Sequence, residues 1–554
     1  MKDKGDAYYM MKECYADTVF INGKVITVDK EDSIKEAVAI INNKIAFVGS
    51  NKEVKDYIGE NTKVIDINGK TLMPGFIDAH IHLIIFGLLD HGVINVDYNH
   101  VNSIEDIKKL IKEEVKNKKK GEWIVLSGYD HNKLLEKRHP TKEDFDEVAP
   151  DNPVQCIRCC PHMGVYNSQA LKITGVTSPN LFAEGEVVVD ENGEMTGLLK
   201  ETAHMSLSKK VVFAEEDLIR GIKNANKIMI ENGITSVHDA GSYGKDATRL
   251  LQKATLDKLI DIRVRPMIFD MFGKESGKEY IDDFLKTGLY TNIGNDSFKL
   301  GPVKIMTDGS TSGPSCATKE PYCHDPSLKG LQVWEQEEAD EIVTKVHKAK
   351  YQMTAHAVGD KAVELMLNAY EKANDEYSVE DSRHRIEHCA LTNDEIIKKI
   401  KQLKIIPVSN PAFITINGKD YNRFYGKRVN KMFPLKTYIN EGIITAIGSD
   451  APVTFPDPMF TIYGAINRMD IKTGEECGGI EKVDILDIIR MFTYNGAYVS
   501  FEEDIKGSIE EGKLADIVVL SEDILSYPKE KVMDIKVNMT MIDGKIVYER
   551  KGVL

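Results

Sequence analysis

Eight short apolar runs, separated by longer segments with helical periodicity, constrain the fold of this chain more than any other feature. Apolar runs that alternate with amphipathic helical segments are typical of βα units and a parallel sheet. Eight such units are the number that closes a barrel. The sequence therefore predicts an α/β fold, a (β/α)8 TIM barrel over residues 74–504, with strands that begin near Phe76, Ile234, Ile262, Val303, Gln352, His384, Ile405 and Ile444.

Both ends of the chain have a different texture. Short strand-like runs near the N-terminus are separated by turn dipeptides such as Asn22-Gly23, and Asp543-Gly544 marks a similar hairpin near the C-terminus. Such runs predict antiparallel sheets. We expect residues 1–73 and 505–554 to form one small β-sandwich domain.

Two long segments interrupt the regular alternation. An α+β insertion at about 101–210 separates the first and second predicted strands, and it includes a charged amphipathic helix and a hairpin at Asn192-Gly193. A second long loop is expected at 412–434, after the seventh strand. Segments that follow barrel strands lie at the carboxyl face, where they can roof a pocket.

The bulk properties limit the class of protein. The net charge of −15 argues against nucleic-acid binding, which depends on a surplus of Lys and Arg. No apolar run has the length needed to cross a membrane, and residues 1–20 lack the apolar core of a secretory signal. We expect a cytoplasmic protein with a small-molecule partner and, by default, a homodimer.

Ligand-type side chains recur at the ends of the predicted strands. His80 and His82 lie two residues apart in FIDAHIHL, so they point to the same face of a strand. His356, His388 and Asp450 follow at the ends of later strands. Because carboxyl ends of strands converge in a barrel, the five side chains together predict a metal site, although each alone is an ordinary strand-end residue.

Lys304 lies on the fourth predicted strand, where its ammonium would repel metal ions. Burial and the positive field could deprotonate the amine, which would then react with CO2 to give a carbamate that bridges two metals. The alternative is a lysine that packs elsewhere or pairs with a carboxylate such as Asp308. The residues alone do not separate the two.

The eight cysteines are scattered, and their one cluster is Cys156, Cys159 and Cys160. We interpret these as reduced, buried thiols. A zinc site that joins this cluster to Cys316, Cys323 and His324 is a weaker alternative, since nothing in the sequence fixes their separation in space.

The motifs, taken in order, resemble the amidohydrolase superfamily, and more closely its branch that includes N-substituted formamide deformylases, the amidohydrolase 3 type. The resemblance covers nearly the whole chain. It is carried by PGFIDAHIHL from Pro74, VKIMTDGS from Val303, AHAVGD from Ala355, RHRIEH from Arg383, GSDAPV from Gly448 and GSIEEGKLADIVVL from Gly507.

The resemblance implies two zinc ions. In the family pattern His80 and His82 would bind one metal, His356 and His388 the other, and N6-carboxylated Lys304 would bridge them. Asp450 would contact the metal and the reactive water. Every one of these positions is present in this sequence.

The expected activity is hydrolysis of a non-peptide amide-type C–N bond in a small molecule. A metal-bound hydroxide would attack the carbonyl carbon, and Asp450 would transfer the proton to the departing nitrogen. Candidate substrate contacts, which resemble positions near the pocket in this branch, are Tyr129, Asp130, His162, Asp308 and Arg468. Glu201, His238 and Asp239 are expected to form hydrogen bonds behind the ligands.

Two alternatives remain open. A mononuclear zinc deaminase of a heterocycle would need Lys304 without its carboxyl group and would bind one ion. A non-catalytic barrel protein would be expected to have lost ligands, and this chain has lost none.

Overall fold

The computed structural model describes residues 15–553, except residues 90, 91, 161, 183–185, 209, 212, 214, 242, 243 and 272. The first fourteen residues of the predicted terminal domain therefore lie outside the described part. No helix in the described ranges combines the length and the apolar character needed to cross a membrane.

All eight predicted central strands are present, and each begins within two residues of its predicted start. They form one sheet of three strands and one of five, and every neighbouring pair is parallel and consecutive along the chain. The strands are β8 (Phe76–Ile81), β15 (Ile234–Asp239), β16 (Arg263–Val264), β17 (Val303–Met306), β18 (Met353–Ala357), β19 (Arg385–His388), β20 (Ile406–Ser409) and β21 (Ala446–Ile447).

Backbone hydrogen bonds link the two sheets at both of their edges. On one side the amide of Lys304 donates to the carbonyl of Ile268 at 3.0 Å. On the other side the amide of Asp450 donates to the carbonyl of His80 at 2.7 Å, and the amide of His82 donates to that of Ala451 at 2.9 Å. The carboxyl ends of β8 and β21 are thereby held together, which brings their side chains to one place.

Helices follow most of the central strands. In α12, Ile396, Ile397 and Ile400 recur at helical spacing and are buried, while Asn393 caps the first turn by accepting from the amide of Ile396. The helices around the strands are α2 (Leu83–Leu88), α7 (Glu215–Glu231), α8 (Gly244–Leu256), α9 (Lys274–Leu285), α10 (Gln336–Lys348), α11 (Asp360–Glu376), α12 (Asp394–Leu403), α14 (Leu435–Glu441), α15 (Pro458–Asn467), α16 (Ile485–Met491) and α17 (Tyr494–Tyr498).

The insertion after β8 is a separate α+β layer. Its six-stranded sheet has the order β13-β14-β12-β11-β10-β9, and it begins at Ile94, somewhat before the predicted start. The strands are β9 (Ile94–Asn95), β10 (Ile124–Tyr129), β11 (Val154–Arg158), β12 (Met163–Tyr166), β13 (Glu186–Val189) and β14 (Met195–Lys200), and the helices are α3 (Ile104–Glu114), α4 (Lys142–Asp146), α5 (Ser168–Thr174) and α6 (Glu201–Ser208).

The prediction of a long loop at 412–434 is wrong. This segment forms helix α13 (Ala412–Tyr425), followed by the 3-10 turn η2 (Gly426–Lys431). Phe413, Ile414, Tyr421 and Phe424 are buried and lie in one apolar cluster. Tertiary burial of these side chains overrides the weak helix propensity of the Asn417-Gly418 pair at its centre. Helix α13 therefore packs through a buried apolar face after the seventh strand, β20.

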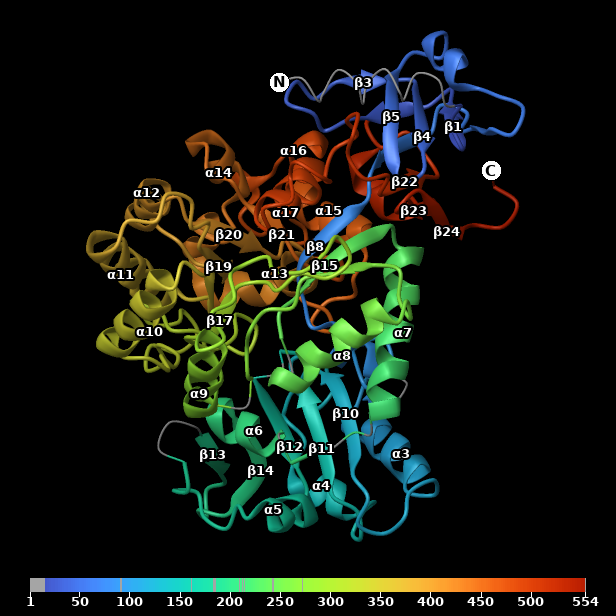
Figure 1. Cartoon of the computed structure of the whole chain (residues 1–554). Coiled ribbons are helices and arrows are strands. Elements are labelled where there is room, and N and C mark those ends of the chain that lie inside the picture. The colour runs from blue at the N-terminus through green and yellow to red at the C-terminus, as the bar shows by residue number, and fades with distance from the viewer. Residues whose placement is uncertain are drawn as a thin grey trace.

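Strands from both ends of the chain meet in two further sheets. Strand β22, near the C-terminus, pairs with β7 in antiparallel fashion, and buried residues of the two sheets share one apolar cluster that includes Phe20, Val38, Val519 and Met539. The first sheet contains β1 (Thr18–Ile21), β4 (Ala37–Ile41), β5 (Lys44–Gly49) and β6 (Lys63–Asp66); the second contains β2 (Lys24–Ile26), β3 (Ile34–Lys35), β7 (Thr71–Pro74), β22 (Ile517–Leu520), β23 (Val537–Ile542) and β24 (Lys545–Glu549). Figure 1 shows these sheets and the insertion sheet at opposite ends of the central strands.

A buried ion cluster joins the central strands to the chain that returns to the terminal sheets. The carboxylate of Glu502 accepts hydrogen bonds from Arg265, and it lies 2.9 Å from the ammonium groups of both Lys299 and Lys506. Burial alone raises the pKa of Glu502, but Lys506 and Arg265 outweigh it and hold that pKa well below its usual range. Each charge in the cluster depends on Glu502 for its partner.

Replacement of this carboxylate is expected to destabilise the fold. In Glu502→Gln the three cations lose their counter-charge, and breaking a buried pair on one side costs about 3–5 kcal/mol of unfolding free energy. Urea unfolding of this variant beside Glu511→Gln, which changes an exposed residue and should stay within about 0.5 kcal/mol of the parent, measures the difference. Equal midpoints for the two variants would show that the cluster contributes nothing.

Candidate metal centre

The predicted ligands come from four strand ends. His80 lies on β8, His82 caps the helix that follows it, His356 lies on β18, and His388 ends β19. Asp450 follows β21, and both His388 and Asp450 have left-handed backbones, with φ of 68° and 58°. Non-glycine residues seldom adopt this conformation, and here it turns each side chain at the end of its strand.

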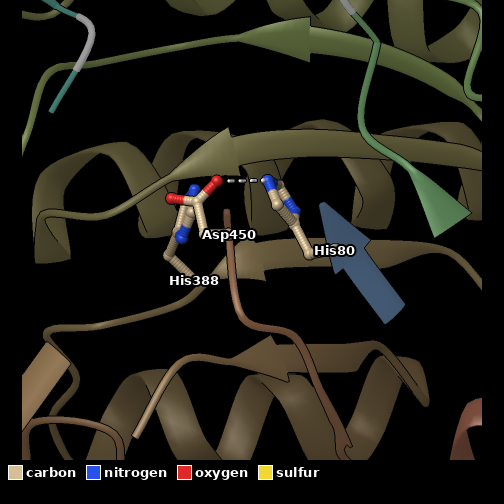
Figure 2. Close-up of side chains that lie close together, drawn as sticks. All are labelled: His80, His388 and Asp450. Carbon is tan, nitrogen blue, oxygen red and sulfur yellow. Dashed lines mark ion pairs between the residues drawn. The ribbon is translucent and has the colours of Figure 1, made fainter. Parts of the chain in front are cut away.

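These side chains converge. The Nε2 atoms of His80 and His82 lie 3.3 Å and 3.4 Å from Oδ1 of Asp450. The ring of His388 lies 4.8 Å from that of His80 and 4.6 Å from that of His356. Figure 2 shows Asp450 between His80 and His388, and ligand atoms of these three residues lie within 4.8 Å of one another. One ion would fit between them.

In each of the four histidines, one ring nitrogen contacts an oxygen atom of a neighbouring residue. Nδ1 of His80 contacts Oε2 of Glu387 at 2.5 Å, and Nδ1 of His82 contacts the carbonyl of Gly241 at 2.6 Å. Nδ1 of His388 contacts Oδ1 of Asn410 at 2.8 Å, and Nε2 of His356 contacts the carbonyl of Gly309 at 3.1 Å. These acceptors fix the ring orientations and leave the second nitrogen of each ring for a metal.

The rings are neutral, which is the form that binds metals. Burial, followed by the nearby positive charge of Lys304, lowers the pKa of His82 and of His388 to about 3. Burial likewise lowers the pKa of His80 and His356 well below the usual value. Nε2 of His80 is also a buried polar atom without a hydrogen-bond partner, which a metal would satisfy. The donor set of neutral imidazoles and a carboxylate fits zinc.

Lys304 and Asp450 have shifted pKa values for the same reason. Burial lowers the pKa of Lys304 to about 8 and raises that of Asp450 to about 7. The ammonium of Lys304 donates to the carbonyl of Ala240 at 3.0 Å and lies 4.9 Å from the ring of Phe269. Lys304 is thus buried among the ligands, and among the described residues the carbonyl of Ala240 is its one hydrogen-bonding partner.

Asp308 is not the counter-ion of Lys304. Its carboxylate accepts hydrogen bonds from the amides of Ala317, Val358 and Gly359 at 2.8–3.0 Å, and it lies 3.6 Å from Nε2 of His356. The structure therefore gives Asp308 a role in holding two loops beside His356. A pairing with Lys304, one of the alternatives left open by the sequence, does not form.

His162 lies beside the ligands. Its ring is 4.9 Å from that of His356, and its Nδ1 contacts Oε2 of Glu201 at 2.9 Å. Burial by itself would lower the pKa of His162, but the Glu201 carboxylate outweighs it and raises this pKa to about 9. Of the predicted substrate contacts, His162 is the one that the insertion brings next to a ligand histidine.

Three other predicted contacts bond to partners outside the ligand set. Tyr129 is buried in the insertion and bonds to Nδ1 of His139 at 2.9 Å, while Asp130 pairs with Arg158 at 2.8 Å. The prediction for Arg468 does not match the structure, because this buried side chain donates to the carbonyls of Cys477, Phe433 and Met432. Arg468 therefore holds neighbouring loops together, and because its side chain is buried it does not lie on a solvated helix face.

The residues expected behind the ligands do form hydrogen bonds there. Asp239 accepts from the amides of Leu83 and Gly241, so it holds both the helix after His82 and the loop whose carbonyl orients that ring. His238 contacts the guanidinium of Arg385 at 3.1 Å. These contacts stabilise the supporting layer of the site.

The sequence interpretation missed Glu387 and Asn410. Glu387 is held by Arg385 at 2.8 Å and by the hydroxyl of Thr354 at 2.6 Å. The sequence did contain a signal for Glu387. Arg385 and Glu387 are two charged residues within a predicted strand whose neighbouring strands are largely apolar, and buried charges need partners. Asn410, after β20, carried no comparable signal.

The alternative cysteine site does not form. Among the residues that the structure describes, His80, His388 and Asp450 are the only group of three or more His, Cys, Asp or Glu side chains close enough to share one ion. Seven cysteines in the described ranges are free, and five of them are buried. This agrees with the interpretation as reduced thiols.

The fold and the site together define a metal-dependent hydrolase. A solved metal-dependent hydrolase from Pyrococcus horikoshii OT3 is 26% identical, superposes with a TM-score of 0.74, and the match covers 92% of this chain and 99% of the other. The chain belongs to the amidohydrolase family, whose model matches residues 63–548. It is accordingly an enzyme that hydrolyses C–N bonds, as the motifs predicted.

Two relatives span almost the full length. YtcJ of Bacillus subtilis (strain 168) is 29% identical over 549 residues, with 96% of this chain and 99% of YtcJ covered. The N-substituted formamide deformylase of Arthrobacter pascens is 27% identical over 551 residues, with 97% and 99% covered. The predicted likeness to the formamide deformylase branch is thereby confirmed.

Asn410 offers a test of the supporting contacts. Asn410→Ala removes the acceptor that orients His388, and loss of such a contact lowers metal affinity about 10–100-fold. Asn410→Asp keeps an acceptor oxygen and should stay near the parent affinity. Zinc titration against a competing chelator compares the two variants, and parent affinity in Asn410→Ala would contradict the role given to this amide.

Proposed function

We propose that this enzyme cleaves a non-peptide amide-type C–N bond of a small molecule at a zinc centre held by His80, His82, His356, His388 and Asp450. The observation that carries the proposal is that four neutral, pre-oriented imidazoles and one carboxylate meet at the ends of β8, β18, β19 and the segment after β21. We further propose that the eight parallel strands act as one closed (β/α)8 barrel and that the two terminal sheets form a β-sandwich.

The amide bond is the preferred target for two reasons. The relative from Arthrobacter pascens is named an N-substituted formamide deformylase, and the match covers 97% of this chain and 99% of that relative. Zinc, when bound, would supply a Lewis acid for the carbonyl oxygen and would lower the pKa of a water molecule. Both contributions suit addition of water to an amide carbon.

Asp450 is proposed as the group that moves the proton. Its Oδ1 faces Nε2 of both His80 and His82, so it lies where the attacking water must be positioned. Oδ1 would accept a proton as the water oxygen bonds to the carbonyl carbon, and it would pass that proton to the nitrogen as the C–N bond breaks.

His162 is proposed to position the substrate. The Glu201 carboxylate contacts Nδ1 of this ring and raises its pKa to about 9, so both ring nitrogens carry a proton at neutral pH, and the ring lies 4.9 Å from that of His356. The N–H group at Nε2 could donate a hydrogen bond to the substrate carbonyl oxygen, where negative charge develops.

Removal of the Asp450 carboxylate should abolish most turnover. We expect kcat of Asp450→Asn to fall about 10²–10⁴-fold on N-substituted formamides or N-acyl amines, the range typical of a lost general base. Asp381→Asn, which changes a half-exposed aspartate outside the site, serves as the control. Parent rates in Asp450→Asn, with its unfolding midpoint unchanged, would refute the assignment.

Lys304 is proposed to carry a carbamate that bridges two zinc ions. Burial among the ligands, where its ammonium donates to the carbonyl of Ala240, lowers the pKa of Lys304 and favours the neutral amine that reacts with CO2. The competing function, a mononuclear deaminase, needs this amine unmodified.

Metal counting separates the two functions. We expect two ions per chain, and we expect removal of CO2 to reduce both activity and the second ion until bicarbonate is restored. In Lys304→Met neither quantity should respond to bicarbonate. Elemental analysis beside rate measurements provides both readouts, and one ion per chain with CO2-independent activity would favour the deaminase.

A further inference from the structure

A cleft lies between the insertion and the loops at the ends of the central strands. Its volume is about 330 Å³, within the size range of small-molecule sites. Ser127 and Asp130 of the insertion form one side, while Ile416 of α13 and Phe460 of α15 contribute from the other.

Two segments that carry predicted ligands also contribute to the wall of the cleft. Phe86, which lines it, lies one helical turn after His82 on α2. Pro452 and Val453, also in the lining, follow Asp450 within three residues. The cleft and the ligand set thus share the segments that follow β8 and β21, and this shared wall is the basis for assigning the cleft to the substrate.

An aromatic surface is available in the cleft. Phe455 is 56% exposed, although it lies in a concave surface, and its ring packs edge-on against Phe86 at 5.9 Å. Phe460 and Tyr98 add further rings. Large exposed aromatic side chains in a recess are typical of sites that bind an apolar group.

The charges of the cleft have one sign. Asp97, Asp130 and Asp457 line it, whereas no Lys or Arg of the described chain belongs to the lining. Two nearby cations already have carboxylate partners, because Arg158 pairs with Asp130 at 2.8 Å and Lys133 with Asp420 at 3.3 Å.

Besides Lys536, whose charge acts on the carboxyl group of Asp457, Lys472 is a further cation near the cleft. It is exposed, and its ammonium lies 4.1 Å from the ring of Tyr98, outside the lining. Asp130 is paired with Arg158, so a carboxylate bound within the cleft would meet the like charges of Asp97 and Asp457 and no cation of the described lining. An ammonium group would be attracted instead.

These charges also orient the substrate. Hydrolysis of an amide releases an acid, which becomes an anion, and an amine, which becomes a cation. Only the amine is compatible with the aspartates of the cleft. We propose that the cleft binds the amine side of the substrate, and that this side carries an aromatic group, is neutral or cationic, and lacks a carboxylate.

The inference rests on the proposed function where it concerns the bond that is cleaved. Binding of a ligand in the cleft can be tested separately, without turnover. Calorimetry on the metal-loaded enzyme would compare phenylalaninamide with phenylalanine, which differ only in a carboxamide and a carboxylate. We expect phenylalanine to bind at least tenfold more weakly. Equal or tighter binding of phenylalanine overturns the inference.

Phe455→Ala locates the binding. Loss of this ring should weaken phenylalaninamide roughly tenfold, since one aromatic contact and its buried area are removed. Tyr290→Ala removes an equally exposed aromatic ring from a loop outside the cleft and should have no effect. Unchanged binding in Phe455→Ala overturns the assignment of the cleft.

Kinetics then separates the two proposals. We expect kcat/KM for N-formylphenylalaninamide to exceed that for N-formylphenylalanine at least tenfold, and Phe455→Ala to reduce the advantage mainly through KM. Hydrolysis that favours the carboxylate overturns the cleft inference and leaves the proposed function intact. Absence of any amide hydrolysis, with Phe455-dependent binding, refutes the proposed function and supports the cleft.

Discussion

The buried pair of Arg385 and Glu387 is the interaction on which the metal centre depends. Glu387 accepts from Arg385 and contacts Nδ1 of His80, so one carboxylate satisfies a buried guanidinium and orients a ligand. Nη2 of Arg385, which also donates to Glu387, donates to the carbonyl of Ala79 at 2.7 Å, on the strand that carries His80. Strand β19 therefore fixes both its own ligand, His388, and that of β8. Such charges are tolerated inside a protein only when every partner is present.

Other parts of the fold also supply contacts around the candidate metal centre. The loops after strands, which a parallel sheet must have, provide the carbonyls of Gly241 and Gly309 that orient His82 and His356. The insertion adds His162 and Glu201 from a separate sheet. Helix α13 and the segment after Asp450 complete a cleft at the junction of insertion and central strands. Specificity and catalysis thus come from different layers of one chain.

Periodicity and order carried much of the prediction. Eight strands were located within two residues, and the ligand residues were selected because strand ends converge, an argument that needs topology but no coordinates. The expectation failed where local signals are weak. In α13 an Asn-Gly pair suggests a turn, and only the burial of Phe413, Ile414 and Tyr421 decides for a helix. Arg468 failed for another reason, since a charged residue at a helix end gives no sign that three carbonyls surround it.

The sequence by itself determined the α/β fold class and the order of the strands, and it singled out the candidate ligand side chains, because these follow from the spacing of apolar residues and from donor chemistry. Tertiary structure alone decided which acceptor stands behind each histidine, that Lys304 faces the carbonyl of Ala240 and not Asp308, and that three aspartates share a cleft with exposed aromatic rings. These contacts join residues tens to hundreds of positions apart. Their formation depends on loop packing and burial, which no local pattern encodes.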